Sequence, residues 1–373
     1  MLSKRPPMGW NSWNTFGHEI SEELIMQTAD AMVSTGLKDA GYEYVVIDDC
    51  WSLRERVNGK IVADPQKFPN GMRYLADYIH SLGLKFGMYS CAGTMTCARY
   101  PSSYDYEYVD AQTFAEFGVD FLKYDFCNVP KGANGPLLYH RMGLALESCG
   151  REILFSACNW GCDEVEKWIR STGAHMYRST GDINDSFASF RDISLSQINK
   201  LAYSGVGCFN DIDMLIVGMH GKGNVQNGGC TDTEYLTHFA LWCLFMSPLM
   251  IGCDIRNMTP ETLKTLTNKD LIAINQDEEA RTPFILGGVS GNRLAFFRHL
   301  ANGEYVLMYV NFDKFDATIP ALFCDAGLTK NSGKAFELYD IFEGKTVGTF
   351  AEGYAADVPA HGCRVFKVKI VDR

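Results

Sequence analysis

Eight short apolar segments, each ending in polar residues and each followed by a helix-like stretch, recur between residue 7 and about residue 280. They are 7–13, 44–51, 84–90, 119–126, 153–160, 176–182, 205–211 and 248–254. Near-continuous apolar strands that alternate with helices indicate a parallel sheet covered on both faces. Eight such units predict a (β/α)8 TIM barrel of the α/β class. The alternative is a doubly wound open sheet, which normally has a glycine-rich phosphate loop after its first strand; residues 8–14 (MGWNSWN) are not such a loop.

The intervening segments have helical spacing and recognisable start signals. In the first of them, the positions i, i+4, i+7 and i+11 are Ile25, Ala29, Met32 and Gly36. Ser21 precedes them in a capping position. Thr231 and Glu234 have the spacing of a capping box, which predicts the start of a helix that runs through Leu241.

The sequence changes in character after about residue 282. Segments 292–299, 304–312, 334–342 and 363–371 are short, aromatic and β-branched, and turn signals such as Asn302-Gly303 and Glu343-Gly344 follow or precede them. No long helical pattern separates them. This arrangement predicts a small antiparallel β-sandwich. We expect a catalytic barrel over 1–281 and a C-terminal β-sandwich over 282–373.

Charge and composition exclude several classes of partner. The net charge is −11 without a basic run, so we expect no nucleic-acid partner. No apolar stretch reaches about 18 residues, so we expect no membrane span. The 13 cysteines are an odd number and no apolar leader is visible, which favours reduced thiols and a cytoplasmic location, although a chain trimmed of its leader would look the same. The eight histidines are scattered, and no HExxH or CxxC occurs, so we expect neither a metal nor a cofactor.

Chemistry in a TIM barrel lies at the C-terminal ends of the strands, and carboxylates occupy five of the eight predicted ends. They are Asp48 with Asp49, Asp125, Asp182, Asp211 with Asp213, and Asp254. The aromatic residues among them are Trp10, Trp13, Trp51, Tyr89 and Trp160. Gathering like charges costs stability, so a fold would not do this for stability alone. Carboxylates that bind hydroxyl groups, beside aromatic faces that pack on a pyranose ring, predict a sugar site. Asp211 and Asp254 are expected to orient loops instead.

Cleavage of a glycoside needs two carboxyl groups with opposite pKa requirements. Lys123 and Asp125 are two residues apart on one predicted strand and therefore share a face. Because a nearby ammonium lowers the pKa of a carboxyl group, Asp125 is the predicted nucleophile. Asp182 lies across the barrel and is followed by Ile183, so it is the predicted acid/base in a less charge-compensated pocket, although Arg178 is near in sequence. Carboxyl groups about 5–5.5 Å apart would indicate a retaining mechanism.

Nine segments in this order resemble one known family. They are PMGWNSWNTF, VIDDCW, ADPQKFPNGM, LKFGMY, LKYDFC, SACNWG, YRSTGDI, NDIDML and ALWCLFMSPLMIGCDI. Over residues 6–280 the chain resembles glycoside hydrolase family 27, which contains α-galactosidases and α-N-acetylgalactosaminidases. The resemblance implies a retaining exo-glycosidase that releases terminal α-linked galactose through a covalent glycosyl-aspartate. It also implies a galactosyl glycan as substrate and leaves a homo-oligomer open.

The resemblance implies roles for individual residues. Asp125 matches the nucleophile and Asp182 matches the acid/base of the family. Asp48 and Asp49 match the pair that binds O6 and the axial O4 of the sugar, and Lys123 matches a residue that contacts the hydroxyls at C3 and C4. The other implied substrate contacts are Trp13, Tyr89, Cys127, Asn159, Cys162, Arg178, Asp213 and Met214, of which Trp13 and Tyr89 are aromatic walls and Arg178 binds the C2 hydroxyl.

Some positions depart from the commonest family pattern. Asn159 stands where many members have Glu, and Cys162 replaces a bulkier residue; both positions face the C2 substituent in the family. Their sizes favour galactose and leave α-N-acetylgalactosaminidase or β-L-arabinopyranosidase activity as alternatives, with a non-catalytic sugar-binding barrel as a further one. Secreted members pair cysteines that match Cys97 and Cys127, whereas the usual partner of Cys50 is missing.

Overall fold

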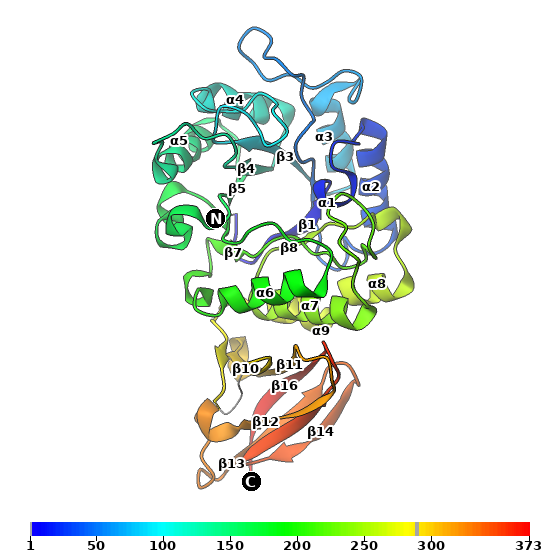
Figure 1. Ribbon diagram of the computed structural model, residues 1–373, viewed down its shortest axis with the longest axis vertical. Coiled ribbons are helices and arrows are strands. Elements are labelled where there is room, and N and C mark those ends of the chain that lie inside the picture. Colours follow the sequence, from blue (N-terminus) through cyan, green and yellow to red (C-terminus); the bar gives the residue numbers. More distant parts are fainter. Residues whose placement is uncertain (1, 288–290) are drawn as a thin grey trace.

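The computed structural model describes residues 2–287 and 291–373, and its larger part is an eight-stranded parallel barrel (Figure 1). The strands are β1 (Met8–Asn11), β2 (Tyr44–Val46), β3 (Lys85–Cys91), β4 (Phe121–Asp125), β5 (Leu154–Cys158), β6 (Met176–Arg178), β7 (Phe209–Asp211) and β8 (Leu249–Ile251). They lie in the order β7-β6-β5-β4-β3-β2-β1-β8. All eight predicted strands are confirmed.

The barrel closes between β7 and β8 through a residue that follows β7. Leu215 forms a parallel bridge with Ile251. Its N–H donates to the Met250 carbonyl at 2.8 Å, and its own carbonyl accepts from the Gly252 N–H at 2.9 Å. Because the segment after β7 is bonded to β8 in this way, the sheet closes on itself. The doubly wound alternative is therefore excluded, and the C-terminal strand ends form one rim.

Helices surround the barrel at the predicted places. They are α1 (Trp13–Phe16), α2 (Glu22–Ser34), α3 (Gly71–Ser81), α4 (Glu107–Phe117), α5 (Gly135–Ser148), α6 (Phe187–Gln197), α7 (Asp232–Leu244), α8 (Pro260–Leu266) and α9 (Lys269–Asn275). Ser21 caps α2 by accepting from the Leu24 N–H. Gly36 was expected inside this helix but lies beyond its end, with a φ of +83° that a helix interior does not allow. The capping box of Thr231 and Glu234 is confirmed, and α7 extends to Leu244.

The C-terminal region is an antiparallel β-sandwich, as predicted. Its strands are β9 (Phe284–Ile285), β10 (Arg293–His299), β11 (Tyr305–Asn311), β12 (Ala317–Leu322), β13 (Lys334–Asp340), β14 (Lys345–Phe350), β15 (Gly353–Val358) and β16 (Cys363–Asp372). Six form the sheet β14-β13-β16-β11-β10-β9, and β12 pairs with β15. Buried aromatic residues such as Phe297, Phe336 and Phe366 fill its core. The boundary between residues 281 and 282 stays a prediction.

The sandwich packs against the side of the barrel that carries α6, α7 and α9 (Figure 1). Arg298 of β10 is fully buried there, and its Nη1 donates to the carbonyls of Leu244 and Ile274, at 3.3 and 2.8 Å. These carbonyls belong to the last turns of α7 and α9, where the helix dipole favours a cation. His361 lies on the same interface, 2.6 Å from Glu234 of α7 and stacked on Phe187 of α6 at 3.6 Å.

No helix among the described residues combines the length and the apolar character needed to span a bilayer.

Gly143 shows that packing overrides helix propensity in this barrel. It lies inside α5, where glycine costs about 1 kcal/mol relative to alanine. A Cβ at this position would come 1.8 Å from the carbonyl oxygen of Thr172. We therefore expect Gly143→Ala to lower the free energy of unfolding by about 1–3 kcal/mol, as overpacking does, in a chemical denaturation experiment.

The matched control is Leu144→Ala in the same helix, because that side chain is 41% exposed. It should change stability by about 0.5 kcal/mol or less. If Gly143→Ala were stabilising, propensity rather than the approach of α5 to Thr172 would decide at this position.

Candidate active site

A cavity opens at the C-terminal ends of the barrel strands and holds about 550 Å³ of empty space, including its open mouth. Its lining residues are Trp13, Asn14, Asp48, Asp49, Tyr89, Cys97, Lys123, Asp125, Cys158, Trp160, Arg178, Asp182, Ile183, Asp213, Met214 and Val225. Seven strand ends or the loops after them, from β1 to β7, contribute charged or aromatic groups. The rim that the sequence predicted is therefore a single concave site.

Ten of the thirteen predicted site residues line this cavity. They are Trp13, Asp48, Asp49, Tyr89, Lys123, Asp125, Arg178, Asp182, Asp213 and Met214. Cys127, Asn159 and Cys162 are not among its lining residues. The sequence-based site set missed Asn14, Cys97, Cys158, Trp160, Ile183 and Val225.

Asp125, the last residue of β4, lies buried on the cavity floor. Its Oδ1 accepts from the Phe126 N–H at 2.9 Å, and its Oδ2 accepts from the hydroxyl of Tyr89 at 3.1 Å. Burial raises the pKa of Asp125 to about 6, although the Lys123 ammonium opposes this shift. The expectation of a lowered pKa is therefore wrong. The physical reason is that removing the carboxylate from water outweighs the attraction of an ammonium that is engaged elsewhere.

That ammonium forms its ion pair with Asp48. Lys123 Nζ lies 2.8 Å from Asp48 Oδ2, which also accepts from Asn11 Nδ2 at 2.7 Å. Asp48 Oδ1 accepts from the Asp49 N–H. Asp48 is thus held rigidly at the cavity wall by three donors, which is the arrangement that positions a carboxylate for hydroxyl groups of a ligand.

Asp49 is fixed by backbone groups. Its Oδ1 accepts from the Cys50 N–H at 2.7 Å, and its Oδ2 accepts from the Ala98 N–H at 2.9 Å. Burial raises the pKa of Asp49 above its ordinary value. Cys50 has a φ of +73°, so the chain turns sharply just after the carboxylate pair.

Asp182, in the loop after β6, lines the same cavity in a different environment. Its side chain is 77% exposed, and its Oδ1 accepts from Arg178 Nη2 at 2.8 Å. The same guanidinium group pairs with the buried Asp213 at 2.6 Å. The expectation that Asp182 lies in a pocket without a close cation is therefore wrong, because Arg178 of β6 contacts both Asp182 and Asp213. Asp213 also accepts from the Ile183 N–H and so holds the loop that carries Asp182.

The wall after β5 differs from the expectation. Asn159 is fully buried, and its side chain donates to the Cys162 carbonyl at 2.8 Å and accepts from the Gly161 N–H at 3.3 Å. It stabilises the turn instead of lining the cavity, while Cys162 is exposed. Cys158 and Trp160 line the cavity in its place. Strict alternation from Ser156 along β5 would have pointed to Cys158.

The other rim residues separate into core and loop roles. Trp10 is fully buried and donates to the Cys253 carbonyl, and Trp51 is buried and donates to the Tyr89 carbonyl. Both tryptophans therefore belong to the core. Asp254 caps a short 3₁₀ helix (Ile255–Asn257), as expected for a loop residue. Asp211 accepts from the Asp213 N–H and orients the loop after β7, also as expected.

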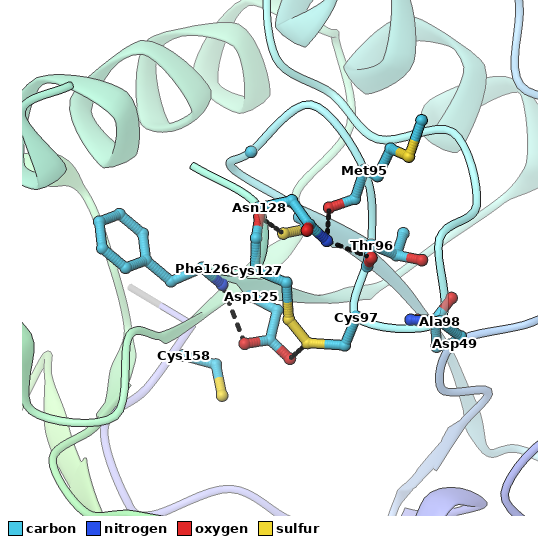
Figure 2. The surroundings of a disulfide bond; sticks show 12 residues. Asp49, Met95, Thr96, Cys97, Ala98, Asp125, Phe126, Cys127, Asn128 and Cys158 are labelled. Carbon is cyan, nitrogen blue, oxygen red and sulfur yellow. Dashed lines mark hydrogen bonds between the residues drawn. A yellow bond between two sulfur atoms is a disulfide. The ribbon is translucent and has the colours of Figure 1, made fainter. Parts of the chain in front are cut away.

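A disulfide joins Cys97 of the loop after β3 to Cys127 of the loop after β4, directly beside the predicted nucleophile (Figure 2). Cys97 Sγ lies 3.9 Å from Asp125 Oδ2. The cysteine pairing that the resemblance implied is thus present. The other cysteines of the described chain, including Cys50, are free.

Both parts of the chain match known protein families. Residues 5–277 match the family described as alpha galactosidase A, and residues 290–368 match the alpha galactosidase C-terminal beta sandwich domain. The α-galactosidase of Cyamopsis tetragonoloba is 40% identical over 98% of this chain and 86% of that protein.

Solved structures agree in fold and length. The α-galactosidase I of Mortierella vinacea has a TM-score of 0.91 and 36% identity, over 98% of this chain and 97% of that one. An α-galactosidase of Saccharomyces cerevisiae, solved with raffinose, has a TM-score of 0.89 and 29% identity, over 99% and 98% of the two chains. The chain therefore belongs to the α-galactosidase family, glycoside hydrolase family 27.

Proposed function

We propose that this chain is a retaining α-galactosidase that releases terminal α-linked galactose from oligosaccharides or glycoconjugates. The observation that carries the proposal is that Asp125 and Asp182 line one cavity together with Asp48, Asp49 and Lys123. Membership of the α-galactosidase family supports this activity. An oligosaccharide substrate is supported by the relative from Saccharomyces cerevisiae, which was solved with raffinose.

In the first step, Asp125 attacks the anomeric carbon while Asp182 donates a proton to the glycosidic oxygen, and the C–O bond to the leaving group breaks. The product is a galactosyl ester of Asp125. In the second step, Asp182 removes a proton from water, the water oxygen attacks the same carbon, and Asp125 leaves. Two inversions at this carbon give net retention.

The surrounding groups fit these two roles. The buried Asp125 is ionised only above about pH 6, and its Tyr89 and Phe126 donors orient it. Asp182 is exposed toward the open mouth, where a leaving group departs and water enters. Arg178 holds Asp182 in place through the 2.8 Å hydrogen bond. Asn14 Nδ2 is buried, lines the cavity and has no partner among the described residues, so it is available to donate to a sugar hydroxyl.

The proposed preference for galactose depends on Asp48, which lies at the wall of the cavity. A carboxylate directed toward O6 serves a sugar that has a hydroxymethyl group at C6, which galactose has and arabinopyranose lacks. Asp48 is held in place by its ion pair with Lys123 and by the side-chain amide of Asn11. Galactose is therefore the proposed substrate. The acetamido alternative depends on space beside C2, where Cys158 and Trp160, rather than Asn159, line the cavity.

Two further expectations are part of the proposal, and a third conflicts with one feature of the structure. We place the barrel at 1–281 and the sandwich at 282–373, and we retain a homo-oligomer as an expectation. A cytoplasmic location also stays an expectation. The Cys97–Cys127 disulfide argues against it, because disulfides persist mainly in oxidising compartments.

The first test removes the nucleophile. Asp125→Gly should lose nearly all hydrolysis of a nitrophenyl α-galactoside, because no covalent intermediate forms. Galactose binding should stay measurable by calorimetry. Added azide should restore turnover by attacking from the vacated side and should give the β-galactosyl azide, the inverted product.

The control for this test is Asp254→Asn, another carboxylate at a strand end, which caps a loop outside the cavity. It should retain activity within about twofold. Undiminished hydrolysis by Asp125→Gly, or a wild-type chain that binds galactose without turnover, would contradict the assignment and favour a binding protein.

The second test is the pH profile of kcat/KM. The nucleophile must be ionised, and burial raises the pKa of Asp125 to about 6. Activity should therefore fall about tenfold for each pH unit below about pH 6. Lys123→Met removes the ammonium that lowers this pKa and should move the acidic limb to higher pH, whatever its effect on the plateau. An acidic limb that does not move in Lys123→Met would contradict the assignment to Asp125.

The third test is substrate selectivity. Loss of a charge-assisted hydrogen bond costs about 1.5–3 kcal/mol, so Asp48→Ala should lower kcat/KM for the nitrophenyl α-galactoside by about 10- to 100-fold. The matching β-L-arabinopyranoside lacks C6, so its kcat/KM should fall less. The ratio of kcat/KM between the galactoside and the arabinoside should therefore become smaller. Activity of the wild type on the arabinoside alone would overturn the choice of galactose.

A further inference from the structure

Two sulfur atoms and one carboxylate oxygen meet beside the cavity. The ligand atoms of Cys97, Cys127 and Asp125 all lie within 4.8 Å of one another. Figure 2 shows the disulfide beside the Asp125 carboxylate, with the Cys97 sulfur next to one carboxylate oxygen. The mechanism uses only Asp125 of these three, so the sulfur pair is left without a chemical role.

We propose that reduction of the Cys97–Cys127 disulfide creates a site for one thiophilic divalent cation, such as Zn²⁺ or Cd²⁺. The two thiolates and the carboxylate of Asp125 are its ligands. Occupancy of the site blocks the nucleophile, so the chain is inhibited by such cations in its reduced form and resists them in its oxidised form.

The disulfide is open to reduction from the cavity side. Cys97 is exposed and lines the cavity, whereas Cys127 is only 7% exposed. The thiolate of an external thiol attacks Cys97 Sγ, and the sulfur of Cys127 leaves as a thiolate. A second thiol then displaces the first from Cys97. In total, two thiols are oxidised to one disulfide, and the protein takes up two electrons and two protons.

Other contacts keep the two sulfur atoms together after the bond breaks. Asn128 Nδ2 donates to the carbonyls of Met95 and Thr96, at 3.3 and 2.8 Å, and the Thr94 N–H donates to the Asn128 carbonyl at 3.2 Å. A Cβ on Gly93 would lie 1.9 Å from the Cys127 carbonyl oxygen, so the two loops are in close backbone contact there. The two loops therefore stay in contact once the bond is broken, so the sulfur atoms need to separate only far enough for both to reach one cation, which lowers the cost of binding an ion.

The charge and the chemistry of the site favour a cation of this class. Five aspartates and two cationic side chains line the cavity, which gives it a formal charge of −3. Thiolates select soft or borderline cations over Mg²⁺ or Ca²⁺. Zn²⁺ takes sulfur and carboxylate ligands in tetrahedral geometry, and three protein ligands leave one position for water. A carboxylate engaged in this way cannot attack an anomeric carbon.

The test uses the full chain and Cd²⁺ as the probe. One sample is reduced with a phosphine and freed of it without air, and the other stays oxidised. Reduced protein should lose nearly all activity on a nitrophenyl α-galactoside at saturating Cd²⁺ and recover it with a chelator. Oxidised protein should keep its activity at the same concentration. Galactose should weaken Cd²⁺ binding, because both occupy the face of Asp125.

The control variants separate this site from the other free thiols. Cys324→Ser removes an exposed cysteine of the sandwich and should leave the Cd²⁺ response of the reduced chain unchanged. In the reduced wild-type chain, Cd²⁺ should produce an ultraviolet absorbance from sulfur–cadmium bonds, and galactose should reduce it. Cys127→Ser should abolish this galactose-sensitive absorbance. Asp125→Asn keeps both sulfurs and should weaken Cd²⁺ affinity in that absorbance titration, which needs no turnover and therefore tests the site even if the proposed activity fails.

Equal inhibition of the oxidised and reduced chains would overturn the proposal, because the cation would then act elsewhere. The same holds for a reduced chain that ignores Cd²⁺, or for a Cys127→Ser variant that binds Cd²⁺ at the wild-type concentration in competition with galactose.

Discussion

The site depends on two cations that hold a ring of carboxylates together. Lys123 is paired with Asp48, and Arg178 is paired with both Asp213 and Asp182. Several carboxylates on one buried rim would repel each other and would protonate without such partners. Lys123 comes from β4 and Arg178 from β6, two strands apart in the barrel, and both line the cavity. The binding and the catalytic carboxylates are thus parts of one electrostatic network.

Within this network, Asp125, like Asp49, has no direct cationic partner among the described residues. Its pKa is raised to about 6 by burial, whereas Asp48 beside it is ion-paired. The two cations therefore divide the aspartates into groups with different tasks. Asp48 remains a fixed hydrogen-bond acceptor. The carboxylate of Asp125 is poorly solvated, which favours its proposed role as a nucleophile toward carbon. If Asp125 is the nucleophile, as proposed, the same burial that raises its pKa also sets the acidic limit of activity.

The sequence was sufficient for the barrel, the sandwich and most of the cavity, because strand ends in a parallel barrel must share one rim. Spacing could not show which partner each side chain chooses. Lys123 shares a strand face with Asp125, yet its ammonium reaches past β3 to Asp48, two residues after the end of β2, which depends on the order of the strands in the barrel. Asn159 bonds within its own turn because Trp160 and Gly161 both have positive φ values. Such local geometry has no signature in hydrophobic periodicity.

The sandwich is connected through α7 to the loop that carries Asp182, the proposed acid/base. The loop that follows Asp182 contains Asp185, whose Oδ2 accepts from the Gly221 N–H at 2.7 Å and whose Oδ1 accepts from the Tyr235 hydroxyl at 2.8 Å. Tyr235 belongs to the first turn of α7, next to Glu234, which contacts His361 of the sandwich. An exposed catalytic carboxylate has few contacts of its own, so its position must come from the loop that carries it. The packing of the sandwich on α6 and α7 is thereby connected through Glu234 and Tyr235 to the loop that carries Asp182, whereas the Cys97–Cys127 bond joins two loops beside Asp125.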